Sequence, residues 1–309
     1  MFDVFLKTLP FFALIGVGYG AAKSRFFPPE ATAHLTKFVF YFALSAMLLR
    51  FSANLSFSDI FEPRLAAGYL WGTAVTYGIA MAVAFLRRTD ASTAAIEAQC
   101  AAIGNTGFLG VPMLALLLGQ EAIGPIILIL SIDLVVFSSL LTIIVVGARG
   151  GQVGLRLLRT VGLGLLANPM IVAIAFGLGI SASGLPVPEV ANAFLETLGN
   201  AATPGALFAI GASLATKSAE RLEIAAWLSF AKLILHPAFV AAGVYLFFPV
   251  DAYRASVAVS AAALPVAGNV FILAQHYGVA PQRVSASILI STTFSILTVS
   301  AVIATVATN

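Results

Sequence analysis

Ile103-Gly104-Asn105-Thr106-Gly107, running on to Pro112, breaks one long hydrophobic segment of the chain, and Leu264-Pro265-Val266-Ala267-Gly268-Asn269 breaks another in the matching place of the second half. In lipid every backbone N–H and C=O group needs a partner, so such a break survives at membrane depth only where it is buried in protein or lines a cavity. A matched pair of breaks is typical of membrane carriers, whose solute site lies between them. We therefore predict a binding site where the two breaks meet.

The composition is that of a protein that crosses a membrane many times. Hydrophobic residues make up 60% of the chain, charged residues 9%, and the mean hydropathy is +1.02, whereas a soluble domain carries roughly 25% charged residues. We predict an all-α polytopic membrane protein with ten transmembrane helices and short loops. The ten apolar stretches, each of about 20 residues, fall at 2–22, 29–51, 63–86, 91–118, 121–147, 156–180, 187–215, 221–247, 252–277 and 281–307.

The basic residues gather on one face of this topology. If the loops alternate between the two faces, one face has Arg50, Arg64 and Arg254, with Lys7 just inside the first span. The positive-inside rule makes the other face cytoplasmic and places both termini outside, and Asp3 argues against a cleaved signal peptide. The net charge of +3 therefore needs no nucleic-acid partner to explain it. The cytoplasmic face has Lys23, Arg25, Arg87, Arg88, Arg149, Arg156, Arg159, Lys217, Arg221 and Arg283.

The two halves, 1–150 and 151–309, are related in sequence. Adding 159 to the residue number carries Pro10 to Pro169 and Gly18 to Gly177, and a later offset of 161 carries Asp90 to Asp251 and Gly107 to Gly268. Matches of Pro and Gly mark backbone features rather than general hydrophobicity. Because five spans is an odd number, the second half enters from the opposite face, which predicts two inverted five-helix repeats. Chance identity between hydrophobic sequences is the alternative.

The two breaks are predicted to cross near the middle of the bilayer. Asn105 lies 15 residues after Asp90, and Pro265 lies 14 residues after Asp251, which is about 21–22 Å at about 1.5 Å per residue. The half-helices that begin there point free N–H groups at the centre, and this arrangement binds anions without a buried arginine. The amides of Asn105 and Asn269 and the hydroxyl of Thr106 add donors.

Two other interpretations of the breaks stay open. The carbonyl ends near Ala102 and Ala263 would suit Na⁺, so the helix dipoles alone do not decide the sign of the solute. Gly104, Gly107 and Gly110 would also suit a close helix contact, with Pro265 as a simple kink. The symmetric placement of the pair favours a binding site. The predicted site residues are Asn105, Thr106, Gly107, Pro265, Gly268 and Asn269, with Gly104, Pro112, Val266 and Ala267 as the crossover backbone.

The chain resembles the auxin efflux carrier family, which includes plant auxin exporters and bacterial malonate carriers. The resemblance covers essentially the whole chain. Its most specific motifs are Gly104-Asn105-Thr106-Gly107-Phe108-Leu109-Gly110-Val111-Pro112, Leu264-Pro265-Val266-Ala267-Gly268-Asn269, Lys37-Phe38-Val39-Phe40 and Thr203-Pro204-Gly205-Ala206-Leu207-Phe208-Ala209-Ile210-Gly211-Ala212-Ser213-Leu214.

The family resemblance implies a fold like that of bile-acid sodium symporters and an elevator mechanism. A scaffold from about 1–58 and 153–217 would often dimerise, and a mobile core from about 59–150 and 218–309 would carry the crossing helices. It also implies a bacterial inner membrane location, a homodimer and an organic carboxylate held at Asn105 and Asn269. One departure is Ser45, the repeat mate of Pro204, where the family has Pro, and this puts the helix bend there in doubt.

Charged residues inside the spans are functional candidates by default. By helix rise, Lys232 and Asp133 lie near mid-depth in the eighth and fifth spans. We hypothesise that they form or approach an ion pair whose protonation couples to transport, and a static pair that fixes packing is the alternative. Glu97 and His236 are further candidates for ion or proton coupling. We favour a gate-lining or solvated position for Glu97 and a structural role for His236.

Lys37 and Glu196 are repeat mates on the scaffold spans. For both we favour snorkelling or a structural pairing over contact with a ligand.

No enzyme site, metal site or cofactor site is indicated. Gly211-Ala212-Ser213-Leu214-Ala215 lacks the final Gly of a serine nucleophile motif. His34, His236 and His276 lie in different spans without clustered carboxylates or thiolates, and Cys100 is the single cysteine. We expect no cofactor, although H⁺ or Na⁺ coupling is compatible with the sequence.

The sequence therefore predicts a secondary transporter for small organic anions, with dicarboxylates such as malonate or malate favoured. Larger aromatic carboxylates of the auxin type are the second choice. An anion channel or a sensor with the same fold is the alternative from another class, although a channel is expected to show a continuous polar pore rather than polar residues concentrated at one crossing.

Overall fold

The structure is a computed structural model that describes residues 2–56, 60–149, 155–215 and 222–306. The predicted boundaries at 58, 150 and 217 fall outside these ranges, as do Lys217 and Arg221. Within them the regular structure is helical, apart from one isolated β-bridge.

Helices occupy each of the five ranges predicted for the first half. Three of them contain a π-helical turn in addition to α-helix. The elements are α1 (Phe2–Lys23), α2 (Pro29–Phe38), a π-helical turn (Val39–Ala43), α3 (Leu44–Asn54), α5 (Pro63–Leu86), α6 (Ala91–Ala102), a π-helical turn (Thr106–Gly110), α7 (Val111–Leu118), a 3₁₀ turn (Gln120–Ala122), α8 (Ile123–Ile132), a π-helical turn (Asp133–Phe137) and α9 (Ser138–Ala148).

The second half is also helical in each predicted range. Its elements are α10 (Leu155–Leu166), α11 (Pro169–Ser183), α12 (Glu189–Asn200), α13 (Ala202–Leu214), α14 (Leu222–Phe230), a π-helical turn (Ala231–Leu235), α15 (His236–Ala242), a π-helical turn (Gly243–Phe247), α16 (Ala252–Ala262), α17 (Gly268–Tyr277) and α18 (Pro281–Val306).

Six segments among the described residues are long and apolar enough to cross a membrane by themselves. They are Phe5–Lys23, Pro29–Asn54, Pro63–Leu86, Gln120–Ala148, Leu222–Phe247 and Pro281–Val306. The protein is therefore a polytopic membrane protein. Ten spans remain a prediction, because the other four ranges are divided between shorter helices.

The range predicted as a single span at 156–180 is bent. α10 and α11 meet at 74°, because Asn168 caps α11 by accepting a hydrogen bond from the Met170 N–H at 3.0 Å and Pro169 occupies the first turn. A proline is accommodated there, where its missing N–H costs nothing. Its repeat mate Pro10 lies inside the unbroken α1, so the two first spans differ in shape.

The second span passes the position of Ser45 without a proline. The Ser45 hydroxyl donates to the Phe40 carbonyl at 3.0 Å, across the π-helical turn Val39–Ala43. In the second half the corresponding segment is divided at Ala201 into α12 and α13, and Pro204 lies in the first turn of α13. The backbone near Ser45, where the family has proline, thus differs from the backbone near Pro204 in the second half.

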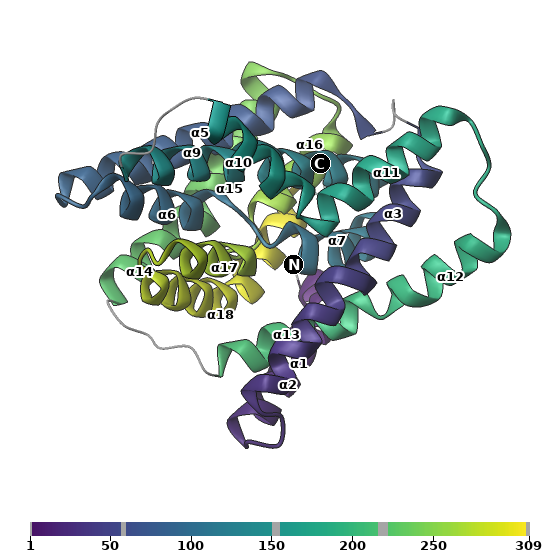
Figure 1. The fold of residues 1–309 in the computed structure, drawn as a ribbon, viewed down its shortest axis with the longest axis horizontal. Helices are drawn as coiled ribbons and strands as arrows, with labels where there is room; N and C mark the ends of the chain where they lie inside the picture. The colour runs from purple at the N-terminus through teal and green to yellow at the C-terminus, as the bar shows by residue number, and fades with distance from the viewer. Residues whose placement is uncertain (1, 57–59, 150–154, 216–221, 307–309) are drawn as a thin grey trace.

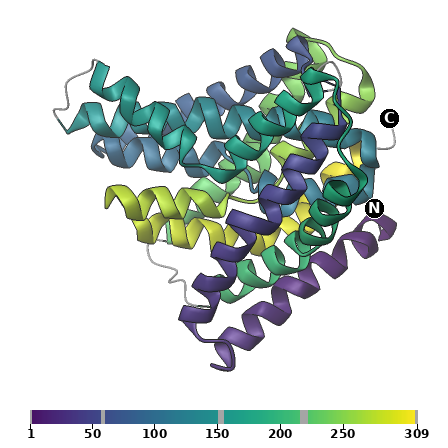
Figure 2. The same cartoon turned by 45° about the vertical axis from the view of Figure 1, so that its right-hand side comes forward.

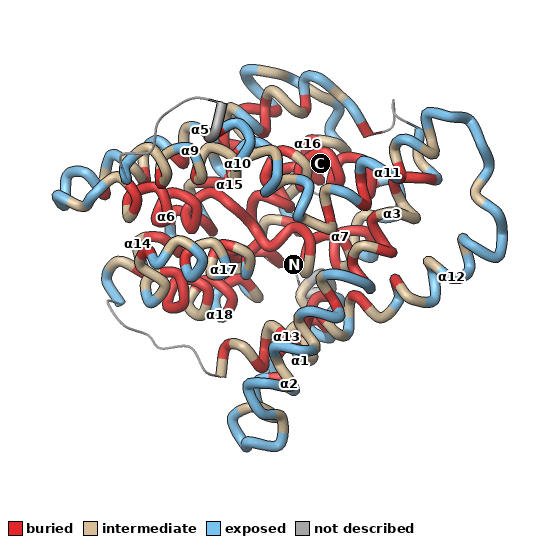
Figure 3. The backbone as a smooth tube through the Cα atoms, viewed as in Figure 1, coloured by how far each residue is buried: buried red, intermediate tan, exposed pale blue. Residues whose placement is uncertain are grey.

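The helices pack in two groups (Figures 1 and 2). In one, α1 lies along α13, and α3 lies along α11 and α12. In the other, α5 packs on α6 and α15, and α14 packs on α18. The groups meet where α1 contacts α18 and where α13 contacts the turn Thr106–Gly110. Buried residues concentrate in α6, α16 and the centre of the molecule, and exposed residues lie on the outer helices (Figure 3).

Matched glycines make matched contacts within the first group. A Cβ added at Gly18 of α1 would overlap the carbonyl oxygen of Phe208 in α13, and one added at Gly177 of α11 would lie 2.8 Å from the carbonyl oxygen of Leu49 in α3. The two contacts correspond in sequence, because Gly177 lies 159 residues after Gly18 and Phe208 lies 159 residues after Leu49. Small residues allow such close approach where lipid replaces water as the solvent.

Candidate functional site

The two breaks meet and pair through their backbones. Gly104 and Val266 form an antiparallel bridge. The Asn105 N–H donates to the Pro265 carbonyl at 2.8 Å, and the Ala267 N–H donates to the Ile103 carbonyl at 3.1 Å. These bonds satisfy groups that the helices leave free at the breaks, as burial away from water requires.

Local sequence explains where each helix stops and starts. Pro265 has no N–H to continue α16, which ends at Ala262. At the first break, the Asn105 carbonyl accepts hydrogen bonds from the N–H groups of Leu109 and Gly110 at 3.1 and 2.9 Å, and these bonds start the π-helical turn Thr106–Gly110. Pro112 follows in the first turn of α7, a position that tolerates proline.

A cavity of about 150 Å³ lies beside the crossing, and we call it the inner cavity. Asn105 and Asn269 both line it, together with Val266 and Gly268. Another part of the wall is formed by Thr36 of α2 and Ser213 of α13, from the group of helices that contains α1 and α13. None of the described lining residues is charged. The inner cavity is therefore neutral, with two side-chain amides at one wall.

The predicted site residues divide into two sets. Asn105, Gly268 and Asn269 line the inner cavity. The Oδ1 atom of Asn269 is buried and has no hydrogen-bond partner. The carbonyl oxygen of this amide therefore accepts no hydrogen bond. Thr106 and Gly107 are buried and are not among the lining residues, and Pro265 contributes its carbonyl to the crossing.

Lys232 lies directly behind the crossing, on the π-helical turn Ala231–Leu235. Its ammonium group donates to the Ala262 carbonyl, at the end of α16, and lies 2.9 Å from His236 Nδ1. A Cβ added at Gly104 would lie 3.3 Å from Lys232 Nζ. His236 Nε2 is 3.0 Å from the Thr73 hydroxyl. This cluster occupies one of the two carbonyl ends that we considered from the sequence as candidate Na⁺ sites.

Asp133 lies on another π-helical turn, Asp133–Phe137, and is buried. The Tyr69 hydroxyl donates to Asp133 Oδ1 at 2.9 Å. Thr106 lies close to the carboxylate, but its hydroxyl and Asp133 Oδ2 do not meet hydrogen-bond geometry. Asp133 and Lys232 interact electrostatically, and no ion pair joins them among the described residues. π-helical turns occur often at functional sites.

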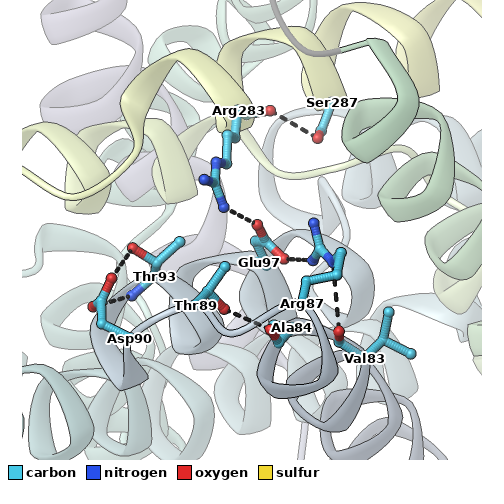
Figure 4. Close-up of polar contacts among 9 residues, drawn as sticks. All are labelled: Val83, Ala84, Arg87, Thr89, Asp90, Thr93, Glu97, Arg283 and Ser287. Atoms are coloured by element: carbon cyan, nitrogen blue, oxygen red, sulfur yellow. Dashed lines mark hydrogen bonds and ion pairs between the residues drawn. The ribbon is translucent and has the colours of Figure 1, made fainter.

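Glu97 was expected to line a gate or to be solvated, and its side chain is fully buried, which rules out the solvated position. Arg87, at the end of α5, and Arg283, in the first turn of α18, each form an ion pair with it (Figure 4). The two guanidinium groups remain partly exposed. Glu97 therefore joins three helices of the second group. The sequence identified both arginines only as topology markers, since nothing in it links residues so far apart.

A second cavity, of about 240 Å³, lies between α3, α12 and α7, and we call it the outer cavity. Pro112, Arg50 and Glu196 are among its lining residues. Glu196 pairs with Arg50 at 3.2 Å, which fits a structural pairing, and Lys37 is exposed. The described residues contain no group of three His, Cys, Asp or Glu side chains that could hold a metal ion.

Comparison with known proteins identifies the family of this chain. Residues 3–303 match the family model described as Membrane transport protein. The chain is also 31% identical over 300 residues, or 94% of its length and 92% of the relative's, to a Rhizobium meliloti (strain 1021) protein named "Putative malonate transporter". These matches make it a membrane transporter and not an enzyme. The chain belongs to the membrane transport protein family, the auxin efflux carriers that its sequence resembles.

Proposed function

We propose that this protein is a secondary carrier that holds a small organic anion at the crossing, between Asn105 and Asn269. The observation that supports this most strongly is that both amides, from breaks 164 residues apart in the sequence, line one cavity. The first turn of α17 begins at the same wall, and a helix N-terminus leaves N–H groups free to bind an anion. These neutral donors face the inner cavity, and the buried Lys232 ammonium group lies behind the crossing rather than among the lining residues.

The size of the inner cavity favours small carboxylates. Its volume of about 150 Å³ is below the roughly 300–1,000 Å³ of sites for drug-sized ligands. A dicarboxylate such as malonate or malate therefore suits it better than an aromatic acid of the auxin type. The name of the Rhizobium relative agrees with this choice.

The packing supports an elevator-type alternating-access mechanism. The α1–α13 and α3–α11 contacts build one group, which would be the scaffold, and the crossing belongs to the other group, which would be the moving core. The inner cavity lies between the groups on one side of the crossing, and the outer cavity lies between them on the other. Following the predicted topology, the inner cavity faces the cytoplasm. The inverted repeat and the homodimer belong to the same proposal.

The buried charges bear on ion coupling. Lys232 occupies the carbonyl end of α16, where a fixed ammonium group replaces a bound cation. We propose that Na⁺ is not required at this end and that Asp133, whose second oxygen is unpaired, is the site where a proton couples to transport. Asp133→Asn should then remove the pH dependence of malonate uptake at a similar maximal rate. An unchanged pH profile would assign Asp133 a structural role.

Counterflow in proteoliposomes tests the proposed function. Vesicles loaded with unlabelled malonate should accumulate external labelled malonate transiently, and the initial rate should saturate. A channel would conduct without stimulation from the opposite side, and a sensor would bind malonate without moving it. A panel of carboxylates, including malate and an auxin-type acid, identifies the class of substrate. Absence of counterflow with every carboxylate would contradict the proposal.

A further inference from the structure

The outer cavity carries a charge that the inner cavity lacks. Met47, Arg50 and Phe51 line the outer cavity, and Ala206, Ala209 and Ile210, each 159 residues later, line the inner one. The two cavities thus use corresponding positions of α3 and α13. At one of these positions the outer cavity has a guanidinium group and the inner cavity has a methyl group.

Arg50 is held in a way that leaves it able to bind a ligand. Its Nε–H donates to Asn192 Oδ1 at 3.2 Å, and the same oxygen accepts from Asn54 at 3.3 Å. A terminal nitrogen of Arg50 pairs with Glu196 at 3.2 Å, and the two side chains are 27% and 49% exposed. An ion pair this exposed to solvent contributes little stability. The guanidinium group is therefore fixed at Nε but only weakly occupied at its terminal nitrogens.

We propose that the outer cavity is a second binding site for the transported carboxylate, in which a carboxylate group displaces Glu196 from Arg50. The guanidinium group binds a carboxylate through two parallel N–H bonds, which Glu196 does not use here. Gln120, Asn200 and Thr203 supply further polar groups, and the volume of about 240 Å³ admits a small dicarboxylate. The inference rests on the proposed function. It makes Arg50 the residue that binds the transported carboxylate on the outward-facing side of the carrier.

The consequence is an affinity that depends on the face of the membrane. An anion that arrives at the outer face meets Arg50, whereas one that arrives from the inner cavity meets only neutral side chains. Glu196 acts as an internal competitor for the same guanidinium group. The two residues therefore have opposite effects on recognition, although they form one ion pair.

Malonate uptake should be measured in intact cells and in inverted membrane vesicles, with wild type, Arg50→Gln, Glu196→Gln and the double variant. We expect Arg50→Gln to raise KM about tenfold at one face only, as for a lost charge-assisted hydrogen bond, and Glu196→Gln to lower it by about threefold at that face. The double variant should behave as Arg50→Gln. Arg254→Gln is the matched control, because it removes a predicted outer cation from another ion pair, with Asp251.

The outcomes separate this inference from the proposed function. If wild type transports no carboxylate, the proposed function fails and this site fails with it. If wild type transports malonate and Arg50→Gln leaves both KM values unchanged, or shifts them equally at the two faces, only the second site is overturned. Equal effects of Arg254→Gln and Arg50→Gln would also overturn it, because general surface charge would then explain the change. The unaffected face serves as the internal check that each variant is folded.

Discussion

The two breaks form the same backbone pairing but differ in their surroundings. In the first, Gly104, Asn105, Thr106 and Gly107 are all buried, and the chain continues as a π-helical turn. In the second, Gly268 is exposed and Asn269 is half-buried, and the chain continues as the regular helix α17. The first break is packed against the buried Lys232 cluster and reaches the inner cavity through Asn105, whereas the second lines the inner cavity with Val266, Gly268 and Asn269.

This difference shows that positions matched in sequence are not packed alike in the two breaks. Gly107 and Gly268 are repeat mates, yet a Cβ at Gly107 would lie 2.6 Å from Met170 Cε, and one at Gly268 would have no neighbour within 4 Å. We infer that both breaks contribute an amide to the anion site and that the first break, which is more tightly packed, also fixes the geometry of the crossing. In an alternating-access cycle, the second break would become the tightly packed one and the first would become the open one.

The largest effect is expected from removing the two amides. Asn105→Ala and Asn269→Ala should each weaken malonate binding about 10- to 100-fold, because a hydrogen bond to a charged group contributes roughly 1.5–3 kcal/mol. The loss should be greater for Asn105, which is 6% exposed, than for the half-buried Asn269. Calorimetric titration of the purified variants measures both. Equal affinities for wild type and both variants would place the anion elsewhere.

A smaller effect, of opposite sign at the two breaks, is expected from Gly→Ala. At Gly104 the added methyl would lie 3.2 Å from the Ala261 carbonyl oxygen and 3.3 Å from Lys232, so Gly104→Ala should destabilise the protein by about 1 kcal/mol or more. Gly268→Ala meets no neighbour and should stabilise the fold by about 0.5 kcal/mol, since alanine restricts the unfolded chain. Melting temperatures in the same detergent compare them. A lower melting temperature for Gly268→Ala would mean that the second break is packed as tightly as the first.

The smallest difference is expected at the starts of α6 and α16. Asp90 accepts from the Thr93 N–H at 3.0 Å (Figure 4), and Asp251 accepts from the Arg254 N–H at 2.9 Å. Replacing either by Ala should cost about 0.5–2 kcal/mol, as for other helix N-caps. Similar costs would show that the halves diverge only at the breaks, and very different costs would place the asymmetry in the helices before them.

The Asp90 cap also has a pH dependence with a defined sign. Hydrogen bonds from Thr93 hold the pKa of this carboxyl below its usual value. Its stabilising effect is therefore present at neutral pH and is lost as the pH falls through the lowered pKa. The difference in melting temperature between wild type and Asp90→Ala should shrink on acidification, and a difference that grows would contradict the cap.

Several elements could be predicted because their signals are local. The helix Pro63–Leu86 has the bounds predicted for the third span, since Glu62 and Pro63 begin it and Arg87 follows its end. Both breaks were found from Gly, Pro and Asn inside apolar runs. Counting helix rise predicted mid-bilayer depth for Asp133 and Lys232, which stays a prediction, and the structure shows both side chains buried in the protein.

Other features depend on how helices rotate and meet, which a single sequence does not specify. Asp133 and Lys232 are both buried, but each turns to a different partner, Tyr69 and the Ala262 carbonyl. Glu97 was expected to line a gate or to be solvated, and its pairing with Arg283 could not be predicted because the two residues are distant in the chain. The bend before α11 was missed because the residues on both sides of Asn168 are apolar.

Thiol labelling tests the central claim most directly. Cys100 is fully buried and is the single cysteine, so Ile272→Cys, which is 51% exposed on the wall of the inner cavity, adds one reactive thiol. Val190→Cys, on the distant helix α12, is the control and is 83% exposed. Malonate should slow maleimide labelling of Ile272→Cys, with half of the effect at its binding constant, and leave Val190→Cys unchanged. Labelling of Ile272→Cys at an unaltered rate in saturating malonate, in a variant that still transports it, would contradict a substrate site at the crossing.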